Sequence, residues 1–156
     1  MGGYFHAAFS LLDKIDAVQN RFLHELNMNP AFAFLTYNFA PPNLRRNIGI
    51  LGLLHKRILG KCHPSFEQLF PLQENPTSGH TKQLYGHWSE ITSHQTIFNR
   101  SIFLMCDIYN NLPQNVVDAP SVRLFQRMLT QEARQRCEDG YADWALSFSR
   151  RAGPDT

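Results

Sequence analysis

The stretch that decides the fold runs from Pro41 to Gly60 and reads "PPNLRRNIGILGLLHKRILG". Two prolines open it and a glycine closes it, a combination that is typical of the start and the end of a helix. Its apolar residues recur at steps of three and four, which places them on one helical face. The residues on this predicted face are Leu44, Ile48, Leu51, Leu54, Ile58 and Leu59.

The same predicted helix carries two pairs of adjacent cations outside its apolar face. No Asp or Glu occurs between Glu25 and Glu67, so nearby acids in the sequence do not offset this positive charge. Lys and Arg side chains that project together are typical of surfaces that bind nucleic-acid phosphates. The open alternative is a solvated face, or one paired with acids of the last helix. The residues predicted to contact RNA or DNA are Arg45, Arg46, Lys56, Arg57 and Lys61.

The composition indicates an intracellular globular chain. With 156 residues, 43% of them hydrophobic, the sequence predicts one domain over residues 1–148 and a disordered tail over 149–156. Its apolar runs are too short to span a membrane, so no membrane partner is expected. Three widely spaced cysteines suit a reducing compartment, which predicts a cytoplasmic or nuclear location.

Apolar spacing and proline punctuation predict further helices, so the fold class is all-α, an irregular bundle of about five to seven helices with a polar central loop. Besides Pro42 to Gly60, the predicted helices are Tyr4–Leu26, Pro30–Asn38, Pro64–Phe70, Ser101–Asn111, Val122 to about Gly140 and Tyr141–Phe148. The loop is Pro71–Lys82, and the period of Leu84–Phe98 is undecided. The predicted core stripe of the first helix consists of Phe5, Phe9, Leu12, Ile15, Val18, Phe22 and Leu26.

The sequence shows no pattern of an enzyme. Cys62 and His63 are neighbours along the chain, which does not make them a catalytic contact. Asp13 and Asp16 are expected on a solvated helix face rather than at a metal. The histidines and cysteines lack the close paired spacing of a zinc module. We therefore predict no catalytic residues, no metal and no cofactor.

Four blocks, in order, resemble a known family. "LDKIDAVQNRFLHEL" (Leu12 to Leu26) is similar to the helix with a VQ-x-R-x-L core that follows the polymerase region of non-LTR (LINE-type, jockey-like) retrotransposon reverse transcriptases. "APPNLRRNIGILGLLHKRILG" resembles their next helix, and "HTKQLYGH" a short element of some members. "RSIFLMCDIYNNLPQNVVDAPSVRLFQRML" resembles their terminal block, with Tyr109 in place of the usual Trp. The blocks extend from about Leu11 to Leu129.

The resemblance implies the helical region downstream of a polymerase, not a polymerase, because no aromatic-x-Asp-Asp motif for two metal ions occurs. In the family this region helps to hold template and primer, so the first expected function is a non-catalytic nucleic-acid-binding module. The second is a protein-interaction or structural subunit, because the first helix also has apolar residues outside its main stripe. The third is a retroelement fragment without a function. The additional apolar residues of the first helix are Tyr4, Ala7, Ala8, Leu11 and Leu23.

Overall fold

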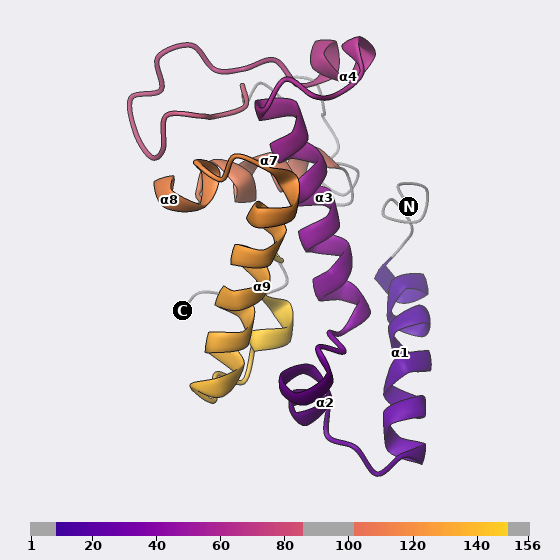
Figure 1. Ribbon diagram of the computed structural model, residues 1–156. Helices are drawn as coiled ribbons and strands as arrows, with labels where there is room; N and C mark the ends of the chain where they lie inside the picture. Colours follow the sequence, from indigo (N-terminus) through magenta and orange to yellow (C-terminus); the bar gives the residue numbers. More distant parts are fainter. Residues whose placement is uncertain (1–8, 86–101, 150–156) are drawn as a thin grey trace. The chain divides into compact units, whose positions relative to one another are not determined.

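The computed structural model describes residues 9–85 and 102–149, in which helices are joined by loops (Figure 1). Within these two ranges there are seven α-helices and one 3-10 helix, and the only β element is an isolated bridge between Leu72 and Leu84. The prediction of an all-α fold with five to seven helices is confirmed. The elements are α1 (Phe9–Glu25), α2 (Pro30–Tyr37), α3 (Pro42–Ile58), α4 (Pro64–Leu69), α7 (Ile102–Asn110), α8 (Gln114–Val117), α9 (Val122–Glu138) and the 3-10 helix η1 (Trp144–Leu146).

Helix boundaries follow from local side-chain chemistry. Asn29 begins α2, because its side-chain oxygen accepts a hydrogen bond from the Ala31 N–H at 2.8 Å while Pro30 occupies the first turn. Asn38 ends the helix in the left-handed conformation, with φ 54°. Pro42 begins α3, and Gly60 follows its end with φ 65°. These boundaries agree with the sequence predictions.

Other predictions are only partly met or fall outside the described residues. The segment Tyr141–Phe148 forms only the short helix η1, and α8, which follows Pro113, was not predicted. Most of Leu84–Phe98 and the predicted tail after residue 149 lie outside the described ranges. None of the helices that the structure describes is both long and apolar enough to cross a membrane.

The chain divides into two compact units, one made of residues 1–48 and 130–156 and the other of residues 49–129. Helix α1, helix α2 and the first part of α3 belong to the first unit, together with the second half of α9. The predicted single domain over residues 1–148 stays a prediction, and each unit is described by itself.

The core of the first unit centres on Phe34 of α2. Phe34 is fully buried and stacks on the indole of Trp144, with ring centroids 5.3 Å apart. Arg134 of α9 donates hydrogen bonds to the carbonyls of Phe34 and Leu35 at 3.0 and 2.7 Å. Because α2 ends there, these guanidinium contacts satisfy carbonyls that have no partner within the helix. Leu44, the first apolar residue of α3, is also fully buried.

The core of the second unit is built from α3, α7 and α9. Leu51 and Leu54 of α3, Tyr109 of α7 and Phe125 of α9 are all fully buried. Gly52 lies against the side chain of Gln126, which would collide with any Cβ at that position. The glycine in the middle of α3 therefore allows a close contact with a side chain of α9, at some cost in helix propensity.

Candidate functional site

Arg46, one of the five predicted phosphate-binding residues, is engaged inside the first unit. Its guanidinium forms a bidentate ion pair with the Asp16 carboxylate of α1, with N–O distances of 2.6 and 2.8 Å. The Arg46 side chain is only 9% exposed and that of Asp16 is 18% exposed. Our expectation of an exposed Arg46 is therefore wrong, as is the expectation of a solvated Asp16. This geometry indicates a structural bond between α1 and α3.

Arg45 remains at the surface but is held by neighbouring residues. It donates a hydrogen bond to the side-chain oxygen of Gln19 at 2.8 Å, and its guanidinium lies 5.7 Å from the centre of the Phe39 ring. Gln19 is itself buried and donates to the carbonyl of Ala40 at 3.1 Å. The Arg45 charge is thus fixed beside α1 and stays accessible.

The other three predicted residues belong to the second unit. Lys56 and Lys61 are exposed, and the described part of the chain offers their ammonium groups no partner. Arg57 is half-buried and donates from Nε to the carbonyl of Phe70 at 2.8 Å. The structure thus brings Arg45 and Arg46 together in one unit and Lys56, Arg57 and Lys61 in the other. Nucleic-acid binding by this set stays a prediction.

The largest departure from the sequence prediction is the orientation of α1. Its buried positions are Leu12, Gln19 and Leu23, with exposed fractions of 6%, 8% and 2%. Most of the predicted core stripe instead faces outward. Five large apolar residues, which we call the outer stripe, are between 45% and 69% exposed; they are Leu11, Ile15, Val18, Phe22 and Leu26.

The outer stripe is continuous along the helix. Its members follow one another at steps of four, three, four and four residues, so successive side chains are neighbours on the helix surface. From Leu11 to Phe22 it extends roughly 17 Å, at 1.5 Å of rise per residue. Phe22 continues it onto Phe39, whose ring meets the Phe22 ring edge-on with centroids 6.2 Å apart.

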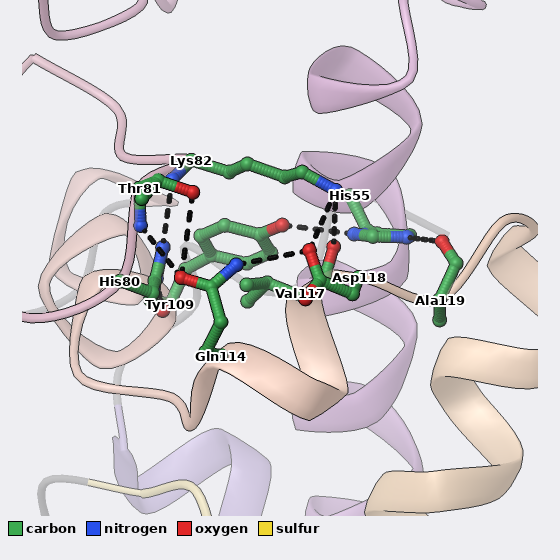
Figure 2. A network of polar contacts seen from close by, with 9 residues as sticks. All are labelled: His55, His80, Thr81, Lys82, Tyr109, Gln114, Val117, Asp118 and Ala119. Atoms are coloured by element: carbon green, nitrogen blue, oxygen red, sulfur yellow. Dashed lines mark hydrogen bonds and ion pairs between the residues drawn. The ribbon is translucent and has the colours of Figure 1, made fainter.

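The second unit contains a buried polar network around His55 of α3 (Figure 2). His55 is fully buried, stacks on Phe125 with centroids 4.2 Å apart, and lies 2.8 Å from both the Tyr109 hydroxyl and the Ala119 carbonyl. A carbonyl only accepts, so Nε2 of His55 carries the proton and Nδ1 accepts the hydrogen bond from Tyr109. Burial is the main reason why the pKa of His55 is lowered, and the nearby Lys82 charge adds to the effect.

The exposed end of the network joins a loop to α8. Gln114 accepts a hydrogen bond from the Thr81 N–H and donates one to the Asp118 carboxylate, each at 2.9 Å. The Lys82 ammonium lies 2.9 Å from the same carboxylate. The hydrogen bond from Lys82, followed by that from Gln114, holds the pKa of Asp118 below its usual value. Protein groups satisfy both nitrogens of His55, so this network ties elements together and leaves no nitrogen to receive a substrate proton.

Nucleophile and metal chemistry find no support among the described residues. No group of three or more His, Cys, Asp or Glu side chains there is placed to hold a metal ion. Burial raises the pKa of the Cys106 thiol, which disfavours the reactive thiolate. The His63 imidazole accepts a hydrogen bond from the Ser65 N–H as the cap of α4, so it serves that helix and not its neighbour Cys62.

Comparisons of the chain with protein-family models, with curated proteins and with solved structures find no match. The resemblance to retrotransposon reverse transcriptases therefore stays a hypothesis. Sequence reasoning missed two features, the Asp16–Arg46 pair and the outward direction of the stripe. The sequence carries no signal for the second, because Gln19 is buried beside a hydrogen-bond partner, the Ala40 carbonyl, that lies 21 positions away.

Proposed function

We propose that this chain is a non-catalytic binding module that docks onto a protein partner through the outer stripe of α1. The observation that supports this is the row of five large apolar side chains, each at least 45% exposed, of which four lie on α1 and Leu26 lies one position past its end. Scattered apolar residues are normal on protein surfaces, but a contiguous apolar row is typical of an interaction site.

Burial of this row against a partner is favourable in free energy. Covering a half-exposed Leu, Ile, Val or Phe side chain removes apolar area worth on the order of 1 kcal/mol. The row forms on a helix that α3 already fixes through the Asp16–Arg46 pair, so docking does not have to order the helix. Apolar anchors on a preformed helix suit recognition of a groove or of a second amphipathic helix.

A display selection tests the docking function. A library of helical peptides is selected against the full chain, with counter-selection against the Val18→Asp variant. Asn20→Asp, which adds the same charge to the exposed opposite side of α1, is the matched control. We expect enriched peptides that bind the wild type and Asn20→Asp but not Val18→Asp. Failure to enrich any peptide with this pattern would overturn the proposal.

A nucleic-acid-binding module of retroelement origin is the second candidate, and the exposed Lys56 and Lys61 favour it. Their ammonium groups are available to phosphates, whereas Arg46 is committed to Asp16. An informative variant therefore replaces Lys56, Arg57 and Lys61 with Gln and leaves Arg46 intact.

The matching measurement is filter retention of RNA and DNA across a salt series. Binding by these cations predicts retention that weakens steeply with salt and is lost in the triple variant. Equal retention by the wild type and the triple variant would rule this candidate out.

A further inference from the structure

The charges that border the outer stripe indicate which class of partner it fits. One long edge carries Lys14 and Arg21, because Lys14 lies three residues after Leu11 and Arg21 lies three residues after Val18. Both side chains are exposed, and the described residues provide neither with a hydrogen bond or ion pair. This edge therefore presents two accessible positive charges beside the apolar row.

The other long edge of the outer stripe is also positive. Gln19, on the side of α1 that faces the core, holds the exposed Arg45 at 2.8 Å, and the Arg45 guanidinium lies over Phe39, onto which the stripe continues. Asp16, the nearby acid on that side, is neutralised by Arg46. The last residue of α1, Glu25, lies four residues after Arg21, on the first edge, and is the one acid beside the row to which the described residues give no ion pair.

We propose that the outer stripe binds an amphipathic helix whose apolar face is bordered by Asp or Glu on both sides. The apolar row would pack against the partner's apolar face, and the carboxylates would meet Lys14, Arg21 and Arg45. Opposite charges that border an apolar seam set which helix pairs and in which orientation. This inference rests on the proposed docking function and specifies the partner's chemistry.

A second copy of this chain fits the surface less well. An antiparallel pairing of two outer stripes would place Lys14 of one copy near Arg21 of the other, and like charges across a helix seam are unfavourable. Asp16 of a second copy could not serve as the complementary carboxylate, because it is already paired with Arg46. The complementary surface is therefore expected on a different and acidic partner.

Two synthetic helical peptides of three to four turns test this inference. They share one apolar face spaced at three and four residues, and they differ only at the flanking positions, which are Glu in one and Lys in the other. Fluorescence anisotropy against the full chain should show the Glu peptide binding at least about tenfold tighter, with the preference shrinking as salt rises. The double variant Lys14→Glu, Arg21→Glu should reduce or reverse the preference, and Val18→Asp should weaken both peptides while Asn20→Asp weakens neither.

The outcomes separate this inference from the docking function itself. If the two peptides bind equally and Val18→Asp still weakens both, docking stands but the acidic partner class is overturned. Binding of neither peptide contradicts both proposals. Partition into vesicles of phosphatidylserine and phosphatidylcholine that Val18→Asp abolishes, without peptide binding, would instead assign the stripe to a lipid surface. A concentration-dependent dimer in analytical ultracentrifugation that Val18→Asp abolishes would assign it to a second copy.

Discussion

Helices α1 and α3 have the same length, 17 residues, and both combine apolar and charged residues at helical spacing, yet they use their apolar residues differently. In α3 the apolar residues are mainly buried, and Leu53, at 38%, is the only large apolar residue of this helix that is exposed. In α1 the fully apolar row, the outer stripe, faces outward, and the row of Leu12, Gln19 and Leu23, which includes a polar residue, faces the core. The difference shows that an amphipathic pattern predicts a helix more securely than it predicts which of its faces is buried.

The largest difference in stability is expected when a leucine is replaced by alanine in α3 and, for comparison, in α1. Leu54→Ala in α3 removes a fully buried side chain, and we expect a loss of about 2–5 kcal/mol in the free energy of unfolding. Leu11→Ala in α1, where the side chain is 51% exposed, should cost less than about 1 kcal/mol. Urea unfolding monitored by circular dichroism compares the two. Equal losses would show that the outer stripe is part of a core.

The next effect concerns the ion pair that joins the two helices. Arg46→Gln leaves the Asp16 carboxylate without its main partner in a site that is only 18% exposed, and we expect a destabilisation of about 2 kcal/mol. Lys56→Gln, which removes an exposed cation from the same helix, is the control and should be almost neutral. A double-mutant cycle with Asp16→Asn measures the coupling. A coupling near zero would refute a structural role for the pair.

Acid should weaken the second unit through His55. The pKa of this imidazole is lowered in the folded chain, while the unfolded chain keeps the ordinary value of 6.5. The unfolded state therefore binds the proton more readily, so the contribution of neutral His55 to stability is present above pH 6.5 and is lost as pH falls below it. The free energy of unfolding should therefore fall when the pH is lowered from above to below this ordinary value.

Urea unfolding at pH 7.5 and pH 5.5 checks this prediction. His55→Gln should be less stable at pH 7.5, because it loses the contacts with Tyr109 and Ala119, and should show a smaller dependence on pH in this range. His24→Gln removes an exposed histidine of α1 and should leave the dependence unchanged. The same pH dependence for His24→Gln and His55→Gln would show that His55 is not the titrating group.

The smallest effect on stability is predicted for the outer stripe. Val18 is 69% exposed, so Val18→Ser should change the free energy of unfolding by less than about 0.5 kcal/mol. The same substitution should lower the fluorescence of a bound apolar dye such as anilinonaphthalene sulfonate, because it shortens the apolar row. A larger loss of stability without a change in dye binding would contradict the outward orientation of α1.

Sequence could predict what depends on neighbouring residues. The Asn29 cap, the prolines that begin α2, α3 and α4, and Gly60 after α3 all act within a few positions of the chain. Those features were sufficient to predict the all-α class and most helix boundaries. The short helix α8 escaped because four residues are too few for a periodic pattern to be recognised.

The candidate site depended on contacts that are distant in sequence. Arg46 meets Asp16 across 30 positions, and Gln19 meets Ala40 across 21. Both rows of α1 contain apolar residues, so the choice between them required knowledge of these partners. The accessible cations could be named from sequence, but only the structure separates Arg46, which is paired, from Lys56 and Lys61, which have no partner among residues 9–85 and 102–149.

The most direct test of the docking role of α1 is a methyl-labelled NMR titration of the full chain with the Glu-flanked helical peptide. We expect the methyl signals of Leu11, Ile15, Val18 and Leu26 to shift strongly, while those of the buried Leu44, Leu51 and Leu54 in α3 change little. Saturable shifts confined to α1 would support docking on the outer stripe. Shifts confined to other methyl groups, or no shifts at all, would contradict it.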